Sequence, residues 1–255
     1  MKSIDVIIIG GGHAGVEAAS AAARMGAKVA LITIDFSKIG VMSCNPAIGG
    51  IGKGHIVREL DALGGVMPLA ADKASIQFKV LNSSKGPAVR GPRCQADRVL
   101  YKKAIQEQVS EQNNITVKSD TVCKLLIQRG ACVGVEMSSG EKIYSGSVVL
   151  TTGTFLNGII YIGGKKESGG RINEAAASHL GNFLKNLNLP MARLKTGTPP
   201  RILKDSINRG ILEEDYGDHM PDYFSVLTNK THNKQVACSV AWTNNTTHKI
   251  IKESI

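Results

Sequence analysis

The residues Gly10-Gly11-Gly12-His13-Ala14-Gly15 have the types and the spacing that bind a dinucleotide. A G-x-G-x-x-G pattern that opens a helix places free backbone N–H groups and the positive end of the helix dipole against a pyrophosphate. The first glycine allows a sharp turn, the second admits the phosphate, and the third lets helix and strand pack closely. These roles fall on Gly10, Gly12 and Gly15. We therefore predict a dinucleotide site at this turn.

Cys44 is the second candidate for chemistry, within the glycine-rich stretch Gly40–His55. Five glycines and one proline in these sixteen residues exclude a regular element and predict a structured loop that forms part of a site. Lys53, His55 or a helix N-terminus would favour the thiolate, the reactive form of cysteine. The alternative is a small buried apolar residue. His13 and His55 are interpreted as spacers or hydrogen-bond donors rather than catalysts.

Clustered cations are the third candidate. The chain has a net charge of +10, from 31 basic and 21 acidic residues. Residues 85–103 hold six cations and one carboxylate, and residues 193–209 hold five cations and one carboxylate. Basic loops of this kind suit the phosphates of a flavin nucleotide or of nucleic acid, although lysines also serve solubility. The candidates for phosphate contact are Lys85, Arg90, Arg93 and Arg201.

A strand, a helix and a second strand must position the glycine turn. Ile4–Ile9 is an apolar run, an alanine-rich segment follows the turn, and Lys28–Thr33 is apolar again. This order predicts a βαβ unit. The second strand of such a unit usually ends on an acidic residue that holds a ribose hydroxyl. Thr33 occupies that place, so Asp35, a hydroxyl or backbone groups would have to hold the ribose.

The remaining chain predicts a mixed α/β fold. Ile115–Lys118 is interpreted as a third strand, residues 121–144 as an antiparallel meander, and Val148–Leu150 as a fully buried strand. The turn after it would place the backbone of Gly153 against a cofactor. Periodic apolar residues predict helices at His55–Leu63, Asp97–Gln112 and Glu174–Leu187, and runs typical of strands occur at Tyr223–Leu227 and Gln235–Trp242.

Composition excludes several classes of protein. With 42% apolar and 20% charged residues the chain is typical of a globular core. No apolar run approaches the roughly 20 residues of a membrane span, and the first strand leaves no room for a signal peptide, so we expect a cytoplasmic location without membrane contact. Five cysteines, widely spaced and without a C-x-x-C pair, predict neither a metal site nor a disulfide framework.

Several motifs together resemble one family of flavoproteins. They are the glycine turn, Met42–His55, Lys85–Arg90, Gln95–Arg98, Thr152–Leu156, Ser168–Arg171 and Lys195–Arg201. This set resembles the glucose-inhibited division protein A family (MnmG), and it covers nearly the whole chain. The stretch around Cys44 is its most specific part.

The resemblance implies a doubly wound, FAD-binding Rossmann-like fold of the glutathione-reductase class. It implies tight binding of FAD, transient binding of NADH, and methylene-tetrahydrofolate as one-carbon donor. It also implies addition of a carboxymethylaminomethyl group to the wobble uridine of tRNA by a homodimer that works with the GTPase partner MnmE. The family's pyrophosphate turn falls on Gly10–Gly15, a backbone contact to the flavin nucleotide on Val122, and one of two functional cysteines on Cys44. Ala177 stands where the family has a serine that contacts FAD.

Family members are more than twice as long as this chain. We therefore expect residues 1–202 to be the N-terminal part of the FAD-binding domain and residues 203–255 to begin an inserted NADH-binding-like domain, both incomplete at the C-terminus. We further expect that the chain alone does not complete the modification. Two other functions remain open: a relative of the folate- and FAD-dependent tRNA uracil methyltransferase, which shares the glycine turn, and a truncated FAD- or RNA-binding module without turnover.

Overall fold

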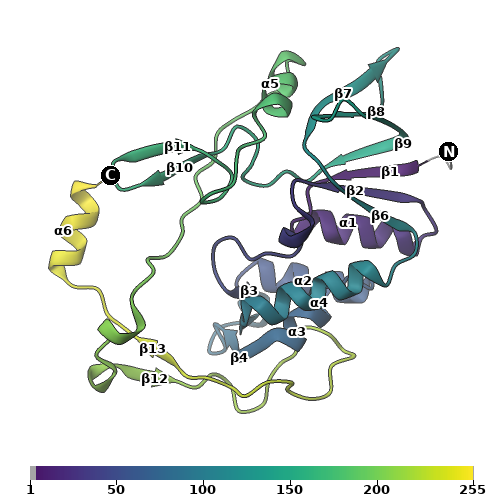
Figure 1. Ribbon diagram of the computed structural model, residues 1–255. Helices are drawn as coiled ribbons and strands as arrows, with labels where there is room; N and C mark the ends of the chain where they lie inside the picture. Colours follow the sequence, from purple (N-terminus) through teal and green to yellow (C-terminus); the bar gives the residue numbers. More distant parts are fainter. Residues whose placement is uncertain (1–3, 255) are drawn as a thin grey trace.

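The computed structural model describes residues 4–254, and its largest sheet is a six-stranded mixed sheet (Figure 1). Parallel strands form one half, in the order β6 (Ile115–Ser119), β2 (Val29–Thr33), β1 (Ile4–Ile9) and β9 (Lys142–Leu150). The other half is antiparallel and continues from β9 through β8 (Ala131–Met137) to β7 (Val122–Gln128). The predicted α/β fold, the third parallel strand and the antiparallel meander are confirmed.

The sheet buries apolar side chains on both faces because successive residues of a strand point to opposite sides. On one face Ile8 and Leu31 pack with α1 (His13–Arg24) and α4 (Arg98–Ser110). On the other face Ile7 and Ile32 pack with the meander and α5 (Ser178–Asn186). Asp97 caps α4 by accepting hydrogen bonds from the backbone N–H groups of Val99 and Leu100. This two-sided core fixes the carboxyl ends of the parallel strands.

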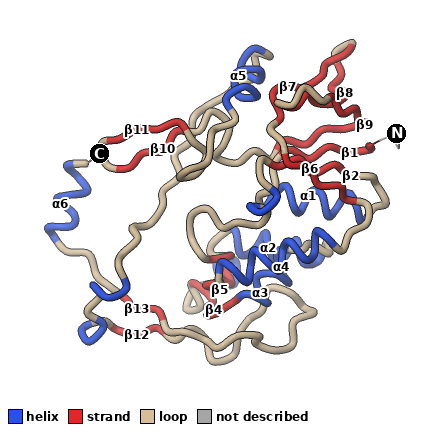
Figure 2. The backbone as a smooth tube through the Cα atoms, viewed as in Figure 1, coloured by secondary structure: helices blue, strands red, loops and turns tan. Residues whose placement is uncertain are grey.

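A smaller antiparallel sheet follows the first βαβ unit in the chain (Figure 2). Its strands lie in the order β3 (Ala47–Gly49), β5 (Gly91–Ala96) and β4 (Ser75–Leu81). The helices α2 (Lys53–Ala62) and α3 (Met67–Ala74) pack beside it, and Ile48, Phe78 and Cys94 join the same core as α1. Two short 3-10 turns, η1 (Phe36–Lys38) and η2 (Pro87–Val89), complete this region. The small sheet therefore shares a core with the large one.

The last hundred residues are less regular. They contain the hairpin β10 (Ile159–Ile162) and β11 (Lys165–Ser168), the 3-10 turns η3 (Lys204–Ser206) and η4 (Arg209–Ile211), the strands β12 (Glu213–Asp215) and β13 (Cys238–Val240), and α6 (Asn245–Glu253). Residues 188–203 form neither helix nor strand and run as an extended segment between α5 and η3 (Figure 1).

Residues 213–240 pack back onto the small sheet. The buried carboxylate of Asp72 on α3 accepts hydrogen bonds from the backbone N–H groups of Phe224 and Ser225, each 2.9 Å long. Val236 N–H donates to the carbonyl of Ile76 over 2.8 Å. These contacts tie much of the predicted second domain to the first. The division at residue 202 stays a prediction.

Two predicted strands differ from the structure. Val148–Leu150 is the end of the longer strand β9, and it is not fully buried: Val149 is 37% and Leu150 41% exposed. Val148 packs against the buried cluster that includes Leu180 and Leu184 of α5, whereas Val149 and Leu150 belong to neither buried cluster. Tyr223–Leu227 is not a strand, because the carboxylates of Asp72 and Asp61 take the N–H groups that a neighbouring strand would bind.

Three other boundaries also differ. The glycine-rich composition of Gly40–His55 predicts no regular element, yet β3 lies inside this stretch because Ile48 pairs with Cys94 of β5. Helix α5 begins at Ser178 rather than Glu174, since the chain first makes a turn in which Glu174 N–H donates to the carbonyl of Arg171. Within Gln235–Trp242, β13 spans three residues.

Candidate functional site

The glycine turn joins β1 to α1 at the carboxyl edge of the parallel strands. Gly10 has a φ of +111°, which favours glycine, and its N–H donates to the carbonyl of Ile32 over 2.8 Å. A methyl group added at Gly15 would overlap the carbonyl oxygen of Gly10 and lie 2.7 Å from Thr151 Oγ1. Close packing therefore requires both glycines.

Gly12 differs from its neighbours because the space beside it is open. A methyl group added there would have no atom within 4 Å, and the φ of −77° is accessible to every residue. Gly12 is the N-cap of α1, no side chain caps this helix end, and its first turn carries no acidic residue. The open space and the uncapped helix N-terminus fit a pyrophosphate, which free N–H groups and the helix dipole would bind.

The other predicted cofactor residues lie along the same edge. Thr151 follows β9, and its hydroxyl donates to the carbonyl of Ile9 over 2.8 Å. Gly153, two residues later, has a φ of +55° and open space beside it. Val122 is buried and packs in one cluster with Ile9 and Ile32. The fold thus gathers Gly10–Gly15, Val122 and Gly153 around the ends of β1, β2 and β9.

The usual acidic ligand of a ribose has no direct counterpart at Thr33, which is nearly buried beside Gly11. The carboxylate of Asp35 caps η1 by accepting a hydrogen bond from Ser37 N–H over 2.8 Å, and the contacts with Ser37 lower the pKa of Asp35. Asp35 is therefore committed at least in part to this local turn.

Sequence reasoning missed a carboxylate at the same edge. Asp120 directly follows β6, and its N–H donates to the carbonyl of Thr33 over 2.9 Å. Hydrogen bonds from Ser138 and Ser139 to its carboxylate lower the pKa of Asp120 to about 2. The signal in the sequence is an acidic residue directly after the third parallel strand. Asp120 is thus ionised at neutral pH beside the end of β2.

His13 is a neutral hydrogen-bonding group in this structure. Its Nδ1 lies 3.1 Å from the hydroxyl of Tyr101 on α4, and the two rings pack edge to face. Burial, followed by the nearby charge of Lys53, lowers the pKa of His13 to about 4. The imidazole is therefore uncharged near neutral pH, and it links the glycine turn to α4.

This pKa shift predicts that stability falls in acid. Between pH 6.5, the ordinary pKa of histidine, and about pH 4, the unfolded chain binds a proton at His13 and the folded chain does not. The contribution of His13 to the free energy of unfolding is complete above that range. It is lost as the pH falls through the range, by about 3 kcal/mol in total. His13→Gln, which keeps a polar group opposite Tyr101, should flatten this dependence. Urea unfolding across the same pH range measures it, and an unchanged slope in His13→Gln would assign the dependence to other groups.

Cys44 lies half-buried in the turn before β3. Its Sγ donates a hydrogen bond to the carbonyl oxygen of Gly197, 2.9 Å away, and its own carbonyl accepts a hydrogen bond from Arg201. Among residues 4–254, neither Lys53 nor His55 forms a hydrogen bond with the thiol. The sequence proximity of Lys53 and His55 to Cys44 therefore gives no hydrogen bond to the thiol.

Arginines contact the stretch around Cys44 instead. Arg98 at the start of α4 donates to the carbonyl of Met42 over 2.5 Å, and Arg171 donates to the hydroxyl of Ser43 over 3.4 Å. Arg98, Arg171 and Arg201 come from three separate parts of the chain. They bind the three successive residues Met42, Ser43 and Cys44. Sequence reasoning identified Arg201 only as a phosphate ligand and missed the other two, although Arg98 and Arg171 both lie in the motifs named above.

The four predicted phosphate ligands are exposed or half-exposed and fall into separate places. Arg90 donates to the carbonyl of Lys85 over 3.1 Å in the exposed turn around η2. Arg93 lies on β5 opposite Gly49, and Arg201 lies beside Cys44. None of the four forms an ion pair with the described residues. Their charges are therefore available, and they lie in three places: the turn around η2, β5, and the extended segment after α5.

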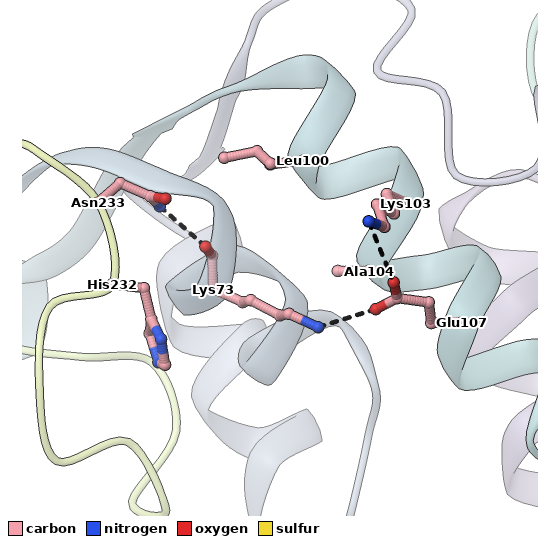
Figure 3. Close-up of a pocket in the computed structure, with 7 residues that line it drawn as sticks. All are labelled: Lys73, Leu100, Lys103, Ala104, Glu107, His232 and Asn233. Atoms are coloured by element: carbon pink, nitrogen blue, oxygen red, sulfur yellow. Dashed lines mark hydrogen bonds and ion pairs between the residues drawn. The ribbon is translucent and has the colours of Figure 1, made fainter.

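A surface pocket between α3 and α4 lies apart from these groups (Figure 3). Lys73 and Lys103 both point toward the carboxylate of Glu107, at 2.8 and 3.8 Å, and Asn233 donates to the carbonyl of Lys73 (Figure 3). Lys73, Lys103 and Glu107 thus pair with one another, and the remaining side chains that line the pocket are Leu100, Ala104, His232 and Asn233. Within residues 4–254, no three His, Cys, Asp or Glu side chains are placed to share a metal ion, and every helix is too short or too polar to span a bilayer.

Comparison with known proteins gives one family. A family model described as glucose inhibited division protein A matches residues 5–255. The structures of Aquifex aeolicus GidA in crystal forms II and I are 45% identical to this chain with a TM-score of 0.93, covering 99% and 100% of this chain but 43% of the Aquifex chain. The GidA-related protein from Thermus thermophilus, 21% identical with a TM-score of 0.54 over 72% of this chain and 68% of its own, shares the fold. The chain thus belongs to the glucose inhibited division protein A family, and it spans less than half the length of the Aquifex relative.

Proposed function

We propose that this chain provides the FAD-binding site and one reactive cysteine of an enzyme that modifies the wobble uridine of tRNA. The observation that carries the proposal is the open, uncapped N-terminus of α1 at Gly12, in a chain of this family. A tightly packed turn that leaves space at a single glycine has the shape that a nucleotide pyrophosphate needs. The reaction is the addition of a carboxymethylaminomethyl group.

The residues of the site divide the work. The backbone from Gly12 to Gly15 holds the pyrophosphate, while Val122 and Gly153 line the nucleotide along the sheet edge. FAD supplies the redox chemistry when it is bound. Cys44 acts on the uracil ring or on the one-carbon unit, as a nucleophile when deprotonated and as an acid when protonated. Because His13 is neutral, its imidazole adds no positive charge to the glycine turn.

The proposal includes further partners. NADH is the reductant, bound mostly by segments that this chain does not contain, and methylene-tetrahydrofolate is the one-carbon donor. The GTPase MnmE and a second copy of the full-length protein complete the assembly, which works in the cytoplasm. Exposed cations such as Lys85 and Arg201 support contact with tRNA, because they form no ion pair with the described residues.

Mass analysis of tRNA nucleosides from cells that lack this gene tests the proposal. Loss of the wobble side chain supports it. Loss of ribothymidine would instead indicate the folate- and FAD-dependent uracil methyltransferase, and unchanged nucleosides would indicate a binding module without turnover. The match of the family model across the whole Cys44 region favours the first outcome.

The salt dependence of tRNA binding should report the predicted phosphate contacts. Each cation that neutralises a phosphate adds about 0.7 to 0.9 to the slope of log affinity against log salt concentration. Replacing Lys85, Arg90, Arg93 and Arg201 with alanine should lower the magnitude of that slope by about 0.7 to 0.9 for each real contact among them. A matched variant removes four cations that already pair with carboxylates: Lys103, Lys118, Lys124 and Lys142. Equal slopes in the two variants would show that the predicted ligands only face solvent.

A further inference from the structure

Two different parts of the chain hold Cys44, and they differ in how firmly they are fixed. The first is the turn that contains it. Met42 is 2% exposed and Ile48 is fully buried, so both ends of the turn are anchored in the core. Arg98 also donates to the carbonyl of Met42 from the N-terminal end of α4. The turn is therefore a rigid platform for the cysteine.

The second part is residues 194–201, which we call the strap. It contains neither helix nor strand, and all of its residues are exposed, Leu194 to 88%. Two contacts join it to Cys44: the thiol donates to the carbonyl of Gly197 over 2.9 Å, and Arg201 donates to the carbonyl of Cys44. Because no buried side chain anchors the strap, these hydrogen bonds are what holds it over the cysteine.

The first contact has a chemical consequence for the sulfur. A thiol can donate its proton to the carbonyl of Gly197, whereas a thiolate has no proton to donate and would face the partial negative charge of that oxygen. The carbonyl of Gly197 and the strap that carries it also occupy one side of the sulfur in this arrangement. Reaction at Cys44 requires the carbonyl to move away, since only the thiolate is nucleophilic.

We propose that the strap is a gate over Cys44 and that Arg201 is its latch. In the closed state, which the structure shows, Arg201 keeps the Gly197 carbonyl against the thiol. In the open state the strap lifts from the rigid turn, and the thiol becomes accessible to a reactant. The significance of the gate for catalysis rests on the proposed function of Cys44, but the gate itself is a property of this chain.

Alkylation of the five cysteines, followed peptide by peptide with mass spectrometry, tests the gate without FAD or tRNA. We expect Arg201→Ala to raise the alkylation rate of Cys44 about tenfold, the effect of losing one hydrogen bond from a charged group. Arg201→Lys, which keeps a charge and a donor, should lie between the variant and the wild type. Lys195→Ala removes a charge from the same strap without touching Cys44 and should leave the rate unchanged.

The other cysteines report whether the fold is intact. Cys94 is fully buried and should stay protected in every variant, while Cys123, Cys132 and Cys238 should keep their own rates. An unchanged Cys44 rate in Arg201→Ala would overturn the gate, and so would an increase of equal size at all four half-buried cysteines. FAD binding measured on the same samples separates the two proposals, because a failure to bind FAD would contradict the proposed function and leave the alkylation result standing.

Discussion

Replacing Gly12 with valine is expected to abolish FAD binding while the chain stays folded. A side chain at this position meets no protein atom within 4 Å, and its φ of −77° suits valine. The branched side chain would fill the space in front of the N-terminus of α1 and keep a pyrophosphate away from the backbone N–H groups. Losing two hydrogen bonds to a charged group at about 1.5 to 3 kcal/mol each weakens binding by roughly 100-fold or more.

Flavin fluorescence titration measures this affinity, and circular dichroism checks the fold. Gly164→Val is the matched control, because Gly164 lies in the β10–β11 hairpin and also has open space beside it. Gly15→Ala gives the opposite contrast, since its methyl group would overlap Gly10 and should destabilise the fold itself. Wild-type affinity in Gly12→Val would show that FAD does not bind at this turn.

The sequence was sufficient for the glycine turn and the elements around it because the determinants are local. A β-branched run before the turn and an alanine-rich run after it define β1 and α1 without help from distant residues. Helix α4 was equally clear, since its cap Asp97 and its apolar period lie in one stretch. Patterns of this kind carry their own boundaries.

Prediction failed where distant segments decide the structure. Val148–Leu150 has the composition of a buried strand, but exposure depends on what covers β9 and not on the strand itself. Tyr223–Leu227 has the residue types of a strand, yet the buried carboxylate of Asp72, about 150 residues earlier in the chain, binds its backbone. No local pattern reveals a partner at that separation.

The same limit explains the surroundings of Cys44. Lys53 and His55 are near Cys44 in sequence, whereas the groups that contact this turn come from Arg98, Arg171 and Arg201. Each of these arginines lies in a conspicuous motif, so the residues can be identified from the sequence. Their common contact with the Cys44 turn cannot, because it depends on how α4 and the strap are placed against that turn.

The second large effect is expected from Cys44→Ser in an enzyme that has the full length of its family. Serine is nearly isosteric, and its hydroxyl can donate to the carbonyl of Gly197 as the thiol does, so the turn and the strap should keep their places. A hydroxyl is a far weaker nucleophile than a thiol near neutral pH. If Cys44 carries out a chemical step, the rate of wobble-uridine modification should fall by roughly 1,000-fold or more, as it does when an enzyme loses its nucleophile.

Modification is measured by nucleoside mass analysis with tRNA, FAD, NADH, methylene-tetrahydrofolate, glycine and the GTPase partner present. FAD affinity should remain at the wild-type level, because the glycine turn does not include Cys44. Cys123→Ser and Cys132→Ser are matched controls, since both thiols are half-buried in the meander, where each donates to a nearby backbone carbonyl. Full modification by Cys44→Ser would return this cysteine to a structural role, and the gate above it would then control access to a thiol that the reaction does not use.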